Sequence, residues 1–208
     1  MNLCSFCLSI LLWSLWTLLG GAILPAASTL AFALNTAVKA LIWLGPGVIF
    51  LLRKDNQWLV MPRAAFSSPF PWWPTLVGLC LTVAFLHTAH IILVGIGTWG
   101  IFQPFWIWVS LAAAVIEELA FRGVLFNRQA ATMGVKWATL VNGLLFALYH
   151  FPEFLLGQNL SAIFGFRFWL LFGMGCIFSH VFAKWKHLGM VIGIHFVWNL
   201  LCYWFALV

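Results

Sequence analysis

Residues 107–126 read IWVSLAAAVIEELAFRGVLF, an apolar run that is interrupted by Glu117 and Glu118 and, later, by Arg122. About 20 apolar residues are enough for a helix to cross the hydrocarbon core of a bilayer. A carboxylate at that depth costs roughly 3 kcal/mol on insertion scales. The chain has only four acidic residues, and two of them stand side by side here. We therefore expect that the chemistry of the protein needs this pair.

The composition places the whole chain in a membrane. It has 208 residues, of which 64% are hydrophobic and only 7% are charged, whereas about 25% of the residues of a soluble domain are charged. The net charge of +6 does not indicate nucleic-acid binding, because Lys and Arg are spread through short loops. We predict an all-α fold, a polytopic helix bundle in the lipid bilayer that forms a single domain over residues 1–208.

Apolar stretches predict about seven transmembrane helices. They cover about residues 3–24, 29–52, 75–96, 105–126, 137–151, 162–182 and 188–207. Between the second and third stretch, residues 55–74 contain four prolines and three tryptophans. That composition is typical of a segment at the membrane interface rather than of a span.

The positive charges of the loops predict an orientation. Three loops hold them, at Arg53, Lys54, Arg63, Arg128, Lys136, Lys184 and Lys186, whereas the intervening loops hold neither Lys nor Arg. Seven spans place all the positive loops on one side of the membrane. By the positive-inside rule, the N-terminus is cytoplasmic and the C-terminus is outside.

Polar side chains of three predicted spans fall at similar depths. With a rise of 1.5 Å per residue from the nearest basic loop residue, Glu117 lies about 16 Å deep and His150 about 21 Å. The same measure places His195 at about 14 Å and Asn199 at about 20 Å. Each could be a polar group that only holds helices together. Their agreement in depth favours one common site near the membrane midplane.

The spacing of these residues also predicts their faces. Residues four apart share a helix face, so His195 and Asn199 point the same way, and Phe146 stands beside His150. Glu118 and Arg122 are also four apart and are expected to pair. Glu117 is about 100° round the helix from Glu118. We therefore expect Glu117 to face the histidines and Glu118 to face Arg122.

Such a set of residues fits hydrolysis within the membrane. A carboxylate and an imidazole can together activate one water, here between Glu117 and His150. His195 and Asn199 can then donate hydrogen bonds to an oxyanion. Zinc is an alternative, because Glu117, His150 and His195 would leave a fourth position open, although the chain lacks a His-Glu-x-x-His helix. A transporter or proton channel is a second alternative, because carboxylates and histidines at this depth also mark ion paths. However, the sequence shows no pair of broken helices in matching halves, which is typical of transporters.

Three motifs resemble those of a known family. The run from Glu117 to Gly123, EELAFRG, is similar to the Glu-Glu-x-x-x-Arg motif of the CAAX-protease and bacteriocin-processing (Rce1/Abi-like) family of intramembrane proteases. Residues 146–150, FALYH, resemble its Phe-x-x-x-His motif, and residues 195–199, HFVWN, resemble its His-x-x-x-Asn motif. The three occur in the family's order, each on a predicted span. The resemblance covers about residues 105–203, and we expect the spans within residues 3–97 to be accessory.

The resemblance implies a role for each matched position. Glu117 and His150 would activate water, His195 and Asn199 would stabilise the oxyanion, and Glu118, Arg122 and Phe146 would support the site. It implies a glutamic-type endopeptidase without a metal, acting near a membrane-associated, C-terminal segment of a protein or peptide substrate. The short chain suggests a member from a bacterial inner membrane. A non-catalytic scaffold or bacteriocin-immunity protein of the same fold, and a zinc-dependent intramembrane protease, are the alternatives.

Overall fold

The computed structural model describes residues 3–23, 29–51, 57–95, 100–152, 165–205 and 207, and all regular secondary structure within these ranges is helical. The elements, in chain order, are α1 (Leu3–Ile23), α2 (Thr29–Leu51), α3 (Ala64–Ser67), α4 (Trp72–Leu93), α5 (Phe105–Glu118), the π-helix η1 (Leu119–Phe126), α6 (Asn127–Met133), α7 (Val135–Tyr149), α10 (Phe166–Trp185) and α11 (Leu188–Trp204). The predicted all-α class is confirmed.

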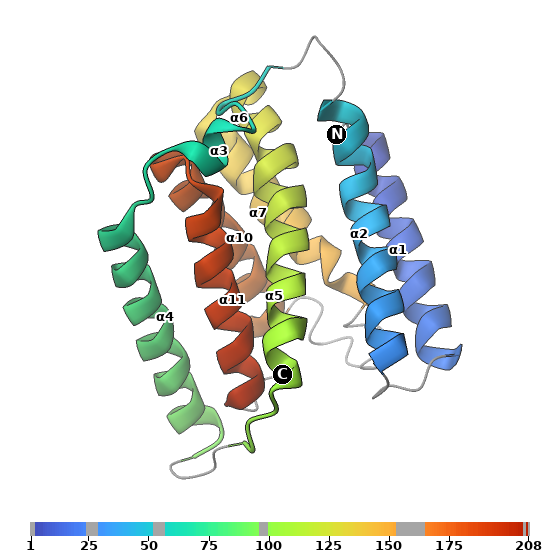
Figure 1. The fold of residues 1–208 in the computed structure, drawn as a ribbon, viewed down its shortest axis with the longest axis vertical. Helices are drawn as coiled ribbons and strands as arrows, with labels where there is room; N and C mark the ends of the chain where they lie inside the picture. The colour runs from blue at the N-terminus through green and yellow to red at the C-terminus, as the bar shows by residue number, and fades with distance from the viewer. Residues whose placement is uncertain are drawn as a thin grey trace.

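The helix of the glutamate pair lies in the middle of the bundle. In Figure 1, α5 stands between α11 on one side and the α1–α2 pair on the other. α11 packs against both α5 and α4, and α7 packs against α10. α2 lies along α5 and η1. Side chains of several helices can therefore reach the end of α5, where the glutamates lie.

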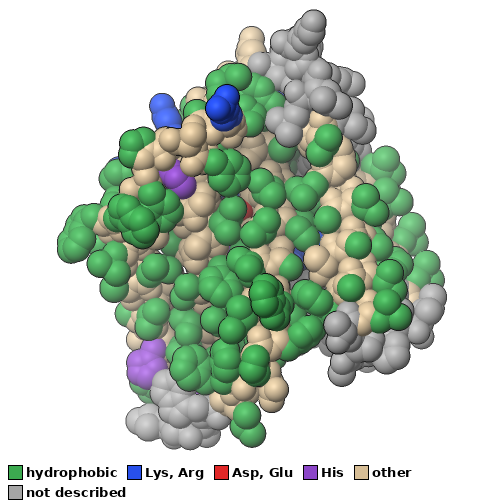
Figure 2. Space-filling model, in the orientation of Figure 1, with side chains coloured by type: hydrophobic (Ala, Val, Ile, Leu, Met, Phe, Trp, Pro, Cys, Tyr) green, Lys and Arg blue, Asp and Glu red, His purple; other side chains and the backbone are tan. Residues whose placement is uncertain are grey.

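The long helices have the length and composition of membrane spans. Stretches long and apolar enough to cross a bilayer lie at Leu30–Val48, Trp72–Leu93 and Phe166–Trp185, and shorter apolar helical stretches lie in α1, α7 and α11. The predicted span at residues 105–126 corresponds to α5 and η1 together. Figure 2 shows hydrophobic side chains over most of the flank of the bundle, with Lys and Arg at the end that holds α3. The protein is a polytopic helical membrane protein.

The helix that carries the glutamates changes its pitch directly after them. α5 continues without a break into η1 and then into α6. A π-helix widens the turn to an i→i+5 pattern, so some carbonyls need donors from elsewhere. Asn142 Nδ2 donates to the Phe121 carbonyl over 3.1 Å, and Asn127 Nδ2 donates to the Gly123 carbonyl over 3.2 Å. Two buried amides thus support the widened turn in which Arg122 lies.

The segment before α4 crosses the end of the bundle instead of spanning it. Within residues 57–71 the only helix is the short α3. Val60 N donates to Asn127 Oδ1 and Asn127 Nδ2 donates to Val60 O, each over 2.8 Å, and Leu59 N donates to Asn127 O over 3.1 Å. Asn127 therefore fastens this segment to the end of η1, as expected for a segment that is not a span.

An aromatic core joins the N-terminal helices to the rest of the bundle. The Trp43 ring of α2 lies 4.8 Å from the Tyr149 ring of α7 and 5.6 Å from the Phe121 ring of η1, measured between centroids. The Trp13 ring of α1 stacks 6.3 Å from Tyr149. Aromatic pairs at 4.5–7 Å are worth about 0.5–1.5 kcal/mol each beyond their buried area. This core holds α2 next to the junction of α5 and η1.

Candidate active site

Both glutamates are buried at the junction of α5 and η1. Glu117 is 5% exposed and Glu118 is fully buried. Four polar side chains contact the pair, and a fifth, His150, contacts one of these four. These are Lys39 on α2, Arg122 on η1, Tyr149 on α7 with His150 directly after it, and His195 on α11.

Glu118 is held by a cation and by an imidazole. Arg122 Nη1 donates to Glu118 Oε1 over 2.9 Å, and His195 Nδ1 lies 2.7 Å from the same oxygen. The Arg122 side chain is fully buried, and its Nη2 donates to the Gly175 carbonyl over 3.1 Å. The expected Glu118–Arg122 ion pair is confirmed. The contact with His195 was not expected from the sequence.

Glu117 uses its two oxygens differently. Lys39 Nζ lies 2.6 Å from Oε1, and the Tyr149 hydroxyl donates to the same oxygen over 3.1 Å. Oε2 lies 3.6 Å from His195 Nε2, which is beyond hydrogen-bonding distance. Among the described residues, none donates a hydrogen bond to Oε2. This oxygen is therefore the part of Glu117 that can accept a proton from another molecule.

His195 stands between the two glutamates. We expected Glu117 to face the histidines and Glu118 to face Arg122, but the imidazole of His195 contacts Glu118 more closely than Glu117. Since a carboxylate accepts, Nδ1 of His195 carries the proton in this contact. Nε2 is then directed at Glu117. The two glutamates are linked through one ring rather than assigned to separate partners.

His150 terminates α7 and is half-buried. Its Nδ1 lies 3.0 Å from the Phe146 carbonyl, so Nδ1 donates and the neutral ring presents Nε2 as an acceptor. Its ring lies 4.6 Å from that of Tyr149, whose hydroxyl bonds Glu117. His150 therefore approaches the glutamates through Tyr149. Within the described part of the chain, no carboxylate lies within hydrogen-bonding distance of His150.

Phe146 lies between the two imidazoles and the guanidinium. Its ring centroid is 5.0 Å from His150 and 6.0 Å from His195, and Arg122 Cζ lies 4.6 Å from its centroid. Phe146 is buried, so it closes one wall of the cluster. The expected place of Phe146 beside His150 is confirmed.

Asn199 follows His195 by one helical turn on α11 and is half-buried. Within the described part of the chain its amide has no hydrogen-bond partner, so it is available to a further group. Lys39 and Tyr149 were missing from the predicted site. Their signals in the sequence are weak: a single Lys within an apolar span, and a Tyr directly before His150.

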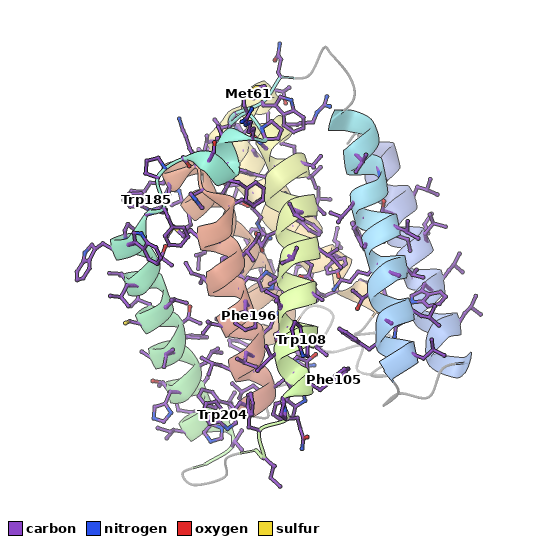
Figure 3. The ribbon with its side chains drawn as sticks, viewed as in Figure 1. Met61, Phe105, Trp108, Trp185, Phe196 and Trp204 are labelled. Atoms are coloured by element: carbon purple, nitrogen blue, oxygen red, sulfur yellow. The ribbon has the colours of Figure 1, made fainter. Side chains whose placement is uncertain are left out.

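An apolar groove lies between α2 and α5. It has a volume of about 370 Å³ and is lined by Phe32, Thr36, Trp108, Leu111, Ala112, Val115 and Ile116. Phe105, at the start of α5, extends toward α2, as Figure 3 shows, and its ring centroid lies 4.9 Å from that of Phe32, which lines the groove. Ile116, which directly precedes Glu117 in the chain, is part of its lining.

Comparisons with known proteins identify the family. No curated protein and no solved structure matches the chain. The sequence model of the family described as type II CAAX prenyl endopeptidase Rce1-like matches residues 98–201, which is half of the chain. The match contains every residue of the three motifs. The chain therefore belongs to the type II CAAX prenyl endopeptidase Rce1-like family of membrane proteases.

Proposed function

We propose that the protein is an intramembrane endopeptidase that hydrolyses a peptide bond by a Glu117-activated water. The observation that carries the proposal is the contact of His195 with both buried carboxylates, at 2.7 Å to Glu118 and 3.6 Å to Glu117. A charge cluster inside an apolar bundle is costly, and such residues mark functional sites by default. The family match supports proteolysis as the reaction.

In the proposed reaction, a water bound between Glu117 Oε2 and His150 Nε2 loses a proton to the carboxylate. The hydroxide attacks the carbonyl carbon of the scissile bond, and the carbonyl oxygen becomes the oxyanion. His195, protonated and held by Glu118, donates from Nε2 to this oxyanion together with the Asn199 amide. When the C–N bond breaks, the proton on Glu117 passes to the leaving amine. The products are a new carboxylate and a new amine.

We propose that the reaction needs no metal. Zinc would have to take its ligands from Glu117, His150 and His195, but Lys39 already places a positive charge 2.6 Å from Glu117 Oε1. A second cation at that carboxylate would be repelled. In addition, no group of three His, Cys, Asp or Glu side chains within the described ranges is arranged to hold a metal ion.

The proposed substrate is a membrane-associated protein that is cut near its C-terminal segment. The groove between α2 and α5 supports this, because it is lined almost entirely by apolar side chains and its lining includes Ile116, the residue before Glu117. We further propose a bacterial inner membrane as the location, with the N-terminus in the cytoplasm. Arg63, Arg128, Lys136, Lys184 and Lys186 all lie in or next to the turns at the end of the bundle that holds α3, which supports that orientation.

The proposal is tested with the full-length protein in liposomes. The probe is a quenched fluorescent peptide with a farnesylated C-terminal Cys-a-a-X sequence, run beside an unprenylated peptide with an apolar C-terminal segment. Wild type is expected to cleave one of them, and His150→Ala to lose at least about 100-fold in turnover. The matched control is His180→Ala, at an exposed histidine away from the cluster. Full activity of His150→Ala, or no cleavage of either probe by wild type, overturns the proposal.

A further inference from the structure

A cation from outside the matched family region contacts the candidate base. Lys39 belongs to α2, whereas the family match covers residues 98–201. The Lys39 side chain is 15% exposed, and its Nζ lies 2.6 Å from Glu117 Oε1. The ammonium also lies 5.3 Å from the Tyr149 ring centroid and 5.6 Å from that of Trp13. Trp13 of α1 and Tyr149 of α7 thus flank this lysine, which α2 presents to Glu117 of α5.

The contact selects one oxygen of Glu117. Lys39 and the Tyr149 hydroxyl both bond Oε1, at 2.6 and 3.1 Å. With Oε1 held from two sides, the carboxylate cannot rotate about its last bond without losing both donors. Oε2 is thereby kept on the side of His195.

We propose that Lys39 and Tyr149 are positioning residues of the catalytic unit, which hold Glu117 Oε1 so that Oε2 acts on the water. This inference rests on the proposed function. Its consequence is that α2 is part of the active unit and not accessory to it. The charged and titratable groups around Glu117 are Lys39 from α2, Tyr149 and His150 from α7 and its end, His195 from α11, and Glu118 and Arg122 from the same continuous helix.

The proposal predicts a loss in kcat rather than in KM. Lys39→Met removes the cation but keeps a long apolar side chain, and it is expected to lower kcat at least about tenfold through misplacement of the base, with KM within about twofold. Lys39→Arg keeps the charge and is expected to retain most of the turnover. Tyr149→Phe removes only the second donor and is expected to lower kcat by a smaller factor. Lys136→Met, at an exposed lysine, is the matched control.

A chemical rescue separates positioning from a purely structural role. In Lys39→Ala, added propylammonium supplies the atoms that the substitution removes, and it is expected to raise turnover in proportion to its concentration. 1-Propanol, which lacks the charge, is expected to have no effect, and neither compound should raise the turnover of wild type. Thermal unfolding of each variant in detergent shows whether it is folded.

The outcomes distinguish the two proposals. If Lys39→Met and Tyr149→Phe cleave the probe like wild type while Glu117→Gln is inactive, the positioning role is overturned and the proposed function stands. If Glu117→Gln is as active as wild type, the proposed function fails and this inference fails with it. If Lys39→Met does not fold, Lys39→Arg and Tyr149→Phe still decide. The positioning role is contradicted if Lys39→Arg loses most of its turnover. It is also contradicted if Tyr149→Phe loses no turnover.

Discussion

His195 Nδ1 donates to Glu118 Oε1 over 2.7 Å, and this bond fixes the imidazole so that Nε2 faces Glu117. The same Glu118 oxygen accepts from Arg122 Nη1 over 2.9 Å. The second glutamate of the pair therefore sets the geometry around the first through a histidine from another helix. This relationship explains why two adjacent carboxylates, rather than one, stand in the middle of a membrane helix.

Removal of one partner of the buried Glu118–Arg122 pair should destabilise the protein strongly. Glu118→Gln leaves the fully buried guanidinium of Arg122 without a counter-charge, which costs about 3–5 kcal/mol in buried pairs. We expect a large drop in thermal unfolding temperature in detergent. Because the loss comes from the orphaned cation, Glu118→Gln combined with Arg122→Met should recover most of that stability. It should not recover turnover, since His195 remains without its carboxylate. A double variant that is less stable than Glu118→Gln would contradict this account.

The contact between α7 and α10 leaves no room for a side chain at Gly143. A Cβ there would lie 2.5 Å from Cys176 Sγ and 2.9 Å from the Phe172 carbonyl. Gly143→Ala should therefore force the helices apart and cost about 1–3 kcal/mol in unfolding free energy. Gly173→Ala is the matched control, because a Cβ at Gly173 meets nothing within 4 Å. Equal free energies of unfolding of the two variants would contradict the claim that α7 and α10 leave no room for a side chain at Gly143.

Asn127 should hold the interfacial segment to the bundle. Asn127→Ala removes both side-chain bonds to Val60 and the bond to the Gly123 carbonyl, and leaves buried backbone groups unpaired at about 1–3 kcal/mol each. We expect faster hydrogen exchange at the Val60 amide and easier proteolysis within residues 57–71. Thr132→Ala, at an exposed position of α6, should change neither. Unchanged exchange at Val60 in Asn127→Ala would contradict this role.

Chelation should leave activity intact. In the proposed mechanism, side chains of the chain itself activate the water. Lys39 already supplies the positive charge beside Glu117 Oε1, so no metal ion is needed there. Protein dialysed against 1,10-phenanthroline and EDTA should cleave the probe at the rate of untreated protein, with no zinc found by elemental analysis. Loss of turnover that returns only when zinc is added back would favour the zinc-dependent alternative.

Contacts within one helix could be predicted from the sequence. The Glu118–Arg122 pair follows from residues four apart, and the place of Phe146 beside His150 follows from the same rule. The spans could be predicted because their composition differs so strongly from that of the connecting segments. The contacts that other helices make with the glutamates could not be predicted, for two physical reasons.

The first reason is distance along the chain. Lys39 and Glu117 are 78 residues apart, and no periodicity relates the face of α2 to that of α5. The second reason is that the 100° between neighbouring residues fixes the angle between Glu117 and Glu118 but not the place of a ring from another helix. His195 of α11 lies where its two nitrogens face both carboxylates. The sequence-based division of partners between Glu117 and Glu118 missed the imidazole that contacts both.

The central claim is that Glu117 is the base that activates water, and one comparison tests it most directly. Glu117→Gln keeps the shape of the side chain and removes only its ability to take a proton. Its turnover of the probe in liposomes should fall at least about 100-fold, while Glu153→Gln, the same change at the only glutamate outside the pair, should behave like wild type. Thermal unfolding verifies that both variants are folded. Wild-type turnover by a folded Glu117→Gln variant would contradict the account.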